Sequence, residues 1–169
     1  MRGDGGAALI NQGIHTIDLL LDVMGKVRSV RGRVATLSHR IEGEDVGAAV
    51  LEFESGALGT IEASTSIYAG FPERLEVHGT EGSVVLEGGK IAARRTRAGQ
   101  SPVARAPSAS GASDPLAIDP ELHRRELADI VDAIRAGRSP TLSGAQGLSA
   151  LRVVRAIYDS SKSGHEILL

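Results

Sequence analysis

Apolar and polar positions recur with helical spacing near the start of the chain, in residues 9–24. The apolar positions step by four, three, four and three residues, as on one face of an amphipathic helix: Ile10, Ile14, Ile17, Leu21 and Met24. A polar series steps by four, three and four residues beside it: Asn11, His15, Asp18 and Asp22. At about 100° per residue, the two series lie roughly a quarter to a third of a turn apart. The pattern predicts a helix that buries one flank and presents polar side chains on the next.

The middle of the chain has the period-two pattern of β-strands. Residues 27–38 alternate in this way, and residues 46–54 and 57–68 flank Ser55 and Gly56, which favour a tight hairpin turn. One face of the segment 57–68 is much more polar than the other, which is typical of an antiparallel sheet covered on one side only. Three further strand-like segments follow with short turns between them: 74–79, 83–87 and 90–96.

The last third of the chain has the start and stop signals of two helices. An Asp-Pro pair at residues 119–120 suits the N-cap and first position of a helix that ends at Gly137. Ser143 can cap a second helix that ends at Gly164, and residues 165–169 can form a short closing strand.

Helices at both ends of a series of strands predict an α+β fold. We expect a mostly antiparallel, open-faced sheet of about six or more strands, with helices packed on one face. Residues 1–169 are expected to form one domain, long enough to bury a substantial core. Residues 97–118 are rich in Ala, Ser, Pro, Gly and Arg and predict a flexible surface loop, either a variable insertion, which we favour, or a lid.

Composition argues against several classes of function. The net charge is −2 and the pI is about 6.2, so no nucleic-acid or membrane partner is expected. The chain has no cysteine, so it has no disulfide and no thiolate zinc site, and the spacing of its histidines predicts no metal site. No apolar run approaches the ~20 residues of a membrane span, and no signal-peptide pattern is present, so we expect a cytoplasmic protein.

His15 is the candidate for proton transfer. The imidazole is the side chain whose unperturbed titration lies nearest neutral pH. Asn11, one turn earlier, could orient the ring or a substrate hydroxyl, and Asp18, three residues later, could fix the tautomer of the ring. On spacing alone, a histidine of the helix surface or of an interface is the favoured interpretation.

Residues 5–18, GGAALINQGIHTID, resemble the start of the C-terminal domain of the Gfo/Idh/MocA (glucose–fructose oxidoreductase/inositol dehydrogenase-like) family. In that family a glycine-rich lead precedes a helix with a D/N-x-x-x-H-x-x-D pattern. Asn11, His15 and Asp18 fill this pattern here. The resemblance returns, in family order, in three later segments: 44–65, 74–89 and 129–164.

The resemblance implies an α+β domain of an NAD(P)-dependent oxidoreductase that acts on the hydroxyl or carbonyl of a sugar, polyol or cyclitol. It implies that His15 is the acid/base that exchanges a proton with the substrate, that Asn11 orients the substrate and that Asp18 supports His15. Tyr68 follows the long strand, near where relatives contact substrate, and is a further substrate-binding candidate, although packing is its favoured role. In relatives the open sheet face commonly mediates oligomers, which implies a homo-oligomer here.

Two parts of the family's site have no counterpart in these residues. Family members place a nucleotide-binding (Rossmann) domain before this point, but the chain has no G-x-G-x-x-G between a strand and a helix. The lysine of the family's Glu-Lys-Pro turn is also missing, since Lys26, Lys90 and Lys162 lie in other contexts. The resemblance therefore implies NAD or NADP in the complete enzyme, no cofactor bound to this chain alone, and an inactive fragment. Many relatives have Asp where Asn11 stands, and an amide cannot accept a proton there.

Two other functions stay open. The chain could be a stand-alone, non-catalytic binding or oligomerisation module, or a lyase or isomerase that uses His15 without a nicotinamide. An in-frame strand–GxGxxG–helix upstream of Met1 would favour the oxidoreductase. Activity without any added cofactor would favour the lyase or isomerase.

Overall fold

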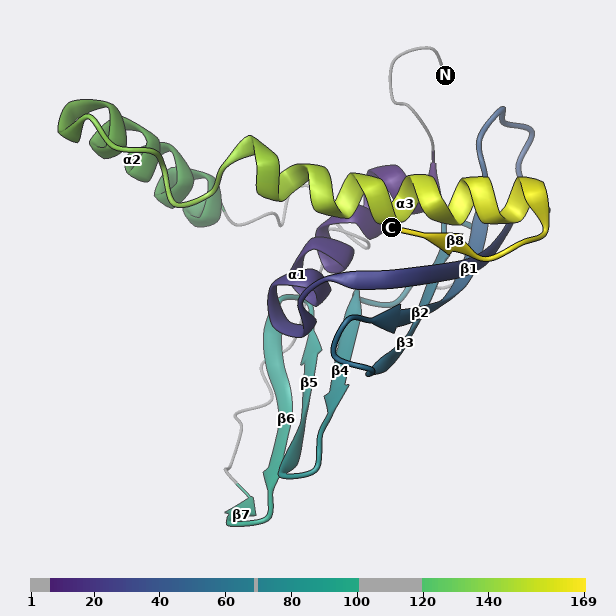
Figure 1. Ribbon diagram of the computed structural model, residues 1–169, viewed down its shortest axis with the longest axis horizontal. Coiled ribbons are helices and arrows are strands. Elements are labelled where there is room, and N and C mark those ends of the chain that lie inside the picture. The colour runs from purple at the N-terminus through teal and green to yellow at the C-terminus, as the bar shows by residue number, and fades with distance from the viewer. Residues whose placement is uncertain (1–6, 69, 101–119) are drawn as a thin grey trace. The chain divides into compact units, whose positions relative to one another are not determined.

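The computed structural model describes residues 7–68, 70–100 and 120–169, which divide into two compact units (Figure 1). The first unit comprises the chain up to Ser66 together with the segment from Glu126 to Leu169. The second unit comprises Ile67–Arg125. Each unit has its own antiparallel sheet.

The first unit is built on a sheet with the strand order β3-β2-β1-β8. Its strands are β1 (Val27–Ala35), β2 (Val46–Phe53), β3 (Leu58–Ser64) and β8 (Ile167–Leu168). All of its neighbouring strands pair antiparallel. The predicted turn between β2 and β3 is confirmed, and Gly56 adopts the positive φ of +83° that the turn requires.

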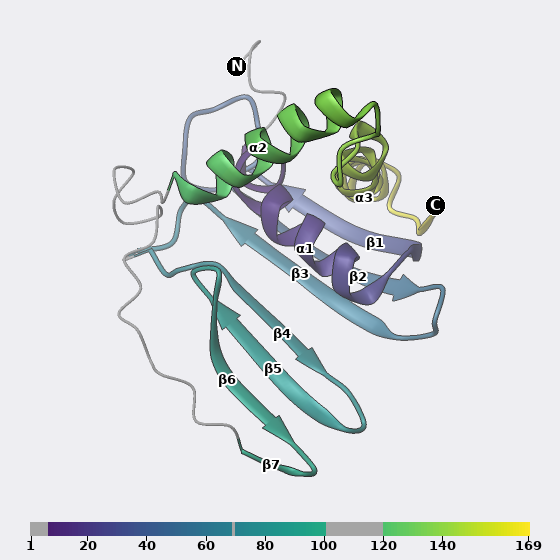
Figure 2. The same ribbon diagram turned by 90° about the vertical axis from the view of Figure 1, so that its left-hand side faces the viewer.

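Helices cover one face of this sheet. Figure 2 shows α1 (Ile14–Met24) and α3 (Gly144–Ser163) over the same side of β1, β2 and β3, and α3 contacts both β1 and α1. The core is formed by inward-facing apolar residues of the sheet and the helices: Leu9, Ile17, Val30, Leu51, Phe53, Val154 and Ile157. Because side chains alternate along a strand, the intervening residues Arg31, Val50 and Thr60 lie on the other, open face.

The predicted ends of α3 are confirmed. The hydroxyl of Ser143 accepts the backbone N–H of Gln146, and the Gln146 side chain accepts the Ser143 N–H, which together form a capping box. At the other end Gly164 adopts the left-handed conformation with φ +75°, and its N–H donates to the Ser160 carbonyl. The preceding helix, α2 (Glu121–Ala136), ends before Gly137, which has φ +64°.

The second unit contains a sheet with the strand order β4-β5-β6-β7. Its strands are β4 (Arg74–His78), β5 (Gly82–Glu87), β6 (Lys90–Thr96) and β7 (Gly99–Gln100). They pair antiparallel in series. Gly88 and Gly89 form the predicted turn between β5 and β6, with φ of +57° and +70°.

The α+β class and the antiparallel pairing are confirmed, and the structure differs from the expected layout in three respects. In the described residues the strands belong to two sheets of four rather than to one sheet. The strand predicted over 57–68 ends at Ser64, because the Ser64 hydroxyl accepts the N–H of Ser66 and so replaces the strand ladder with a local turn. Within the predicted loop 97–118, residues 99–100 form β7, and residues 101–118 lie outside the described part of the chain.

Candidate functional site

The helix predicted over residues 9–24 is in fact two helical segments. Residues Ala8–Gly13 form a π-helix, η1, and α1 begins at Ile14. In a π-helix each backbone hydrogen bond joins residues five apart, so the turn is wider than an α-helical turn. π-Helical turns are rare in proteins, and those that occur are often found at functional sites. The expectation of one regular α-helix was therefore wrong for its first turns.

The residues of this region that face the core differ from the predicted apolar series. Leu9, Ile17 and Leu20 are the buried residues of the region beyond Ala8, whereas four of the five predicted core positions are only half-buried: Ile10, Ile14, Leu21 and Met24. Leu9 turns inward although it lies outside the predicted apolar series, and so does Leu20 in the regular helix α1. Only Ile17 keeps its predicted burial.

The predicted polar series lies on the solvent side. Asn11 in η1 and His15, Asp18 and Asp22 in α1 are all exposed. Within the described ranges, the structure has no hydrogen bond between His15 and Asn11 or Asp18, and none from the His15 ring to any other residue. The structure thus does not show Asp18 fixing the His15 tautomer, and the ring is free to contact a ligand.

Tyr68 lies beyond the end of its strand. It follows the end of β3 by four residues and so is not on the strand face, and its side chain is 98% exposed. It belongs to the second unit, whereas Asn11, His15 and Asp18 belong to the first. The role of Tyr68, in substrate binding or in packing, stays a prediction.

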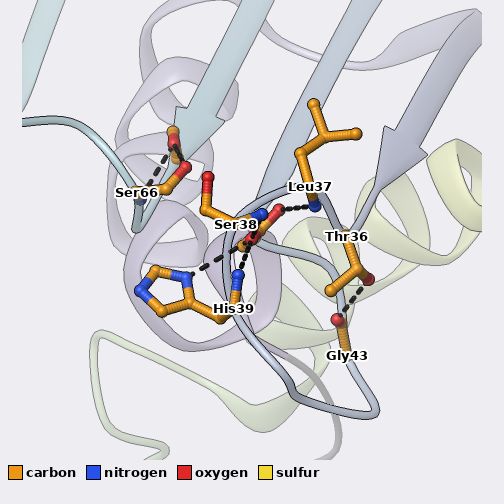
Figure 3. A network of polar contacts seen from close by, with 8 residues as sticks. Thr36, Leu37, Ser38, His39, Gly43 and Ser66 are labelled. Atoms are coloured by element: carbon orange, nitrogen blue, oxygen red, sulfur yellow. Dashed lines mark hydrogen bonds and ion pairs between the residues drawn. The ribbon is translucent and has the colours of Figure 1, made fainter.

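A buried aspartate that sequence analysis missed, Asp45, organises the loop between β1 and β2. Its partners Leu37, Ser38 and His39 are labelled in Figure 3. The Asp45 carboxylate accepts the backbone N–H groups of Leu37 and Ser38, both at 2.7 Å, and of His39 at 2.8 Å. The His39 ring lies 3.3 Å from the same carboxylate. These donors, with the His39 backbone N–H first and Leu37 next, lower the pKa of Asp45 to about 2. Asp45 therefore fixes the loop as a buried anion.

The neighbouring residue, Glu44, was also not predicted and lies beside the first turn of η1. Its carboxylate accepts the Leu9 N–H at 2.8 Å and the Tyr158 hydroxyl at 3.0 Å. Burial first, and then the hydrogen bond to Glu44, raise the pKa of Tyr158 above its ordinary value, so the phenol stays protonated. Glu44 thus connects α3 to η1, which carries Asn11 and leads directly into α1 with His15. The sequence marks these two buried carboxylates only by their place: they are acidic residues at the end of a polar loop, directly before a strand.

The described residues do not fit a dinucleotide site. Such a site needs a parallel strand–helix–strand unit with a glycine-rich turn, whereas the described strands pair only antiparallel. No group of three or more His, Cys, Asp or Glu in the described residues could hold a metal ion. No described helix is long and apolar enough to cross a membrane.

Comparison with known proteins places the chain in a family. The family model for the GFO/IDH/MocA C-terminal domain matches residues 1–85. The chain is 28% identical over 160 residues to the D-apiose dehydrogenase of Rhizobium rhizogenes, and this match covers 92% of the chain and 46% of that protein. It is also 28% identical over 174 residues to the scyllo-inositol 2-dehydrogenase (NAD(+)) of Bacillus subtilis, covering 97% of the chain and 48% of that protein.

A solved structure agrees with these sequence matches. The WlbA dehydrogenase from Bordetella pertussis, determined in complex with NADH and UDP-GlcNAcA, superposes with a TM-score of 0.78 at 29% identity, over 97% of this chain and 46% of that one. The chain spans about half the length of the curated relatives that it matches. The resemblance seen in the sequence is therefore confirmed, and the chain belongs to the GFO/IDH/MocA family, whose C-terminal domain it matches.

Proposed function

We propose that this chain is the substrate-facing domain of an NAD(P)-dependent oxidoreductase that acts on the hydroxyl or carbonyl of a sugar, polyol or cyclitol. Family membership supports the class of reaction, and relatives named as dehydrogenases of D-apiose and scyllo-inositol support the class of substrate. The observation that carries the assignment to a residue is the exposed His15 ring, which has no hydrogen-bond partner among the described residues.

In this proposal His15 exchanges a proton with the substrate hydroxyl or carbonyl. An imidazole can give and take a proton near neutral pH, and a positioned one contributes about 10²- to 10⁴-fold to a rate. Asn11 lies on the exposed side of η1 and can donate to and accept from a substrate hydroxyl. Asp18 supports the charge of His15 when the ring is protonated. Tyr68 stays a prediction as a further substrate-binding residue.

We infer that NAD or NADP is bound by residues outside this chain. The missing glycine-rich fingerprint and the antiparallel pairing of the described strands support this inference. The chain alone is then expected to bind neither nicotinamide form and to be inactive. Its contribution to the complete enzyme is to bind and orient the substrate and to hold the proton-transferring group.

The experiment has two arms. Calorimetric titration of the purified chain with NAD⁺ and NADH is expected to give no binding, and tight binding would overturn the assignment of the cofactor to residues outside it.

In the complete enzyme that carries this domain, His15→Asn is expected to lower kcat by at least about 100-fold. Asp22→Asn, one further position on the same exposed series, is the matched control and should leave kcat unchanged. Full activity of His15→Asn would overturn the proposed role of His15.

We also propose that the open sheet face of the first unit joins copies of the chain into a homo-oligomer. Exposed apolar side chains lie on this face at Val50 and Leu58. They are flanked by a positive charge on β1, at Arg31, and a negative charge on β3, at Glu62. The positive and the negative charge lie on opposite sides of the apolar pair. When two copies meet about a two-fold axis, each charge can therefore face the opposite charge of the other copy. The same face supports the second candidate function, a non-catalytic oligomerisation module.

A further inference from the structure

Glu44 uses both its backbone and its side chain to hold the start of η1. Its carbonyl accepts the Ala8 N–H at 3.2 Å, and its carboxylate accepts the Leu9 N–H at 2.8 Å. The residue is only 7% exposed, so water does not compete freely for these bonds. A carboxylate at a helix N-terminus is also favoured by the partial positive charge of the free N–H groups there.

The first turn of η1 has no side-chain cap of its own. The N-cap position is Ala7, which makes no side-chain hydrogen bond to the turn. The free N–H groups at Ala8 and Leu9 are instead satisfied by Glu44, whose carboxylate also accepts the Tyr158 hydroxyl. Partners from distant parts of the chain therefore do what a local Ser, Thr, Asp or Asn does in an ordinary helix.

Tyr158 ties this arrangement to α3. Its hydroxyl donates to the Glu44 carboxylate at 3.0 Å, and its side chain is half-buried. α3 is itself packed against β1 and carries the core residues Val154 and Ile157 on neighbouring turns. η1 is thus joined, through Glu44, to a helix that packs on the core of the first unit.

We propose that Glu44 and Tyr158 are positioning residues that hold η1 in its π-helical form and so set where Asn11 and His15 meet the substrate. This inference rests on the proposed role of His15. His15 is the second residue of α1, directly after η1, so any change in the wide turn rotates the ring about the helix axis. A displacement of about 1 Å at a reacting group can cost about 100-fold in rate even when the altered residue is remote.

Tyr158→Phe in the complete enzyme tests the proposal, because it removes one hydroxyl and keeps the ring. We expect kcat to fall between about 10- and 100-fold while KM changes less than about threefold, since the substrate still binds but meets a misplaced His15. Glu44→Ala should lower kcat at least as much. Glu44→Gln should restore most of it, because the amide oxygen still accepts from Leu9 and Tyr158.

A second measurement does not depend on activity. In the purified chain, amide hydrogen exchange at Leu9 and Ile10 is expected to accelerate at least about tenfold in Tyr158→Phe. The matched control is Ser161→Ala, which also removes a hydroxyl from α3. That hydroxyl accepts the Val34 N–H of β1 at 3.0 Å and, among the described residues, makes no bond to η1. This variant should leave both kcat and the exchange at Leu9 and Ile10 unchanged.

The outcomes separate this inference from the proposed function. If His15→Asn abolishes turnover but Tyr158→Phe leaves kcat and amide exchange unchanged, the positioning role is overturned and the proposed function stands. If Ser161→Ala lowers kcat as much as Tyr158→Phe, the effect is one of general stability and the positioning role is again overturned. If His15→Asn retains full activity, the proposed function itself fails.

Discussion

The Ser160 hydroxyl on α3 accepts the backbone N–H of Gly32, in the middle of β1, at 3.0 Å. This bond is possible because Gly32 has no side chain: a Cβ there would lie 2.8 Å from Cγ2 of Ile157. Since β8 pairs only with Ser29 and Val30, the rest of this edge of β1 would otherwise carry free N–H groups. α3 therefore covers an edge at which another strand could pair.

Gly32→Ala is expected to destabilise the first unit. The added methyl group would also lie 3.3 Å from the Ala48 carbonyl oxygen and the Ala49 Cβ, so α3 must move away from β1 and weaken the bond to Ser160. Overpacking of this kind typically costs about 1–3 kcal/mol. Urea unfolding followed by circular dichroism gives the free energy of unfolding.

The matched control is Gly147→Ala in α3, where an added Cβ has nothing within 4 Å. Replacing a glycine inside a helix by alanine stabilises by about 0.5–1 kcal/mol, so this variant should unfold at a higher urea concentration. If both variants change the free energy of unfolding by the same amount and in the same direction, the close approach of α3 to Gly32 is not what constrains this position.

The features predicted correctly from sequence are those whose geometry is set by neighbouring residues. Ser143 caps α3 within one turn, as predicted, and Gly88 and Gly89 supply the positive φ that a tight turn needs. The one-sided burial of the sheet also follows from alternation within each strand. Such features depend on residues close in sequence, so they form whatever the distant parts of the chain do.

The first turn of the site could not be predicted in this way. Its π-helical form depends on Glu44, which is 35 residues from Leu9 in sequence, and on Tyr158, which is further still. The spacing of apolar residues suits an α-helix, so nothing local indicated the wider turn. The exposed positions of Asn11, His15 and Asp18 agree with the predicted polar flank, but their role in proton transfer stays a prediction.

Asp45→Asn tests the buried anion of the β1–β2 loop through pH. The pKa of Asp45 is about 2 in the folded chain, below its ordinary value of 3.8, because three backbone N–H groups and His39 stabilise the carboxylate. The stabilisation is therefore complete above about pH 4 and is lost as the pH falls towards about 2. Asp45→Asn should be less stable than the wild type at pH 7, and this difference should shrink between pH 4 and pH 2.

Thermal unfolding at a series of pH values measures this difference. Asp22→Asn is the control, because Asp22 is exposed on α1 and makes no hydrogen bond in the described part of the chain. It should follow the wild type at every pH. A constant difference between Asp45→Asn and the wild type from pH 7 to pH 2 would show that the charge of Asp45 does not stabilise the loop.

Val50→Lys tests the proposed interface on the open sheet face. Val50 pairs directly with Arg31 across β1 and β2, so a lysine there places a second positive charge beside an existing one. Burying this charge between two copies should raise the dissociation constant of the oligomer at least about tenfold, which corresponds to about 1.4 kcal/mol. The measurement is sedimentation equilibrium over a range of protein concentrations.

Val23→Lys is the matched control, because Val23 has almost the same exposure, 54% against 53%, but lies on α1. Oligomers of equal stability in both variants, or a monomeric wild type, would exclude this face as the interface.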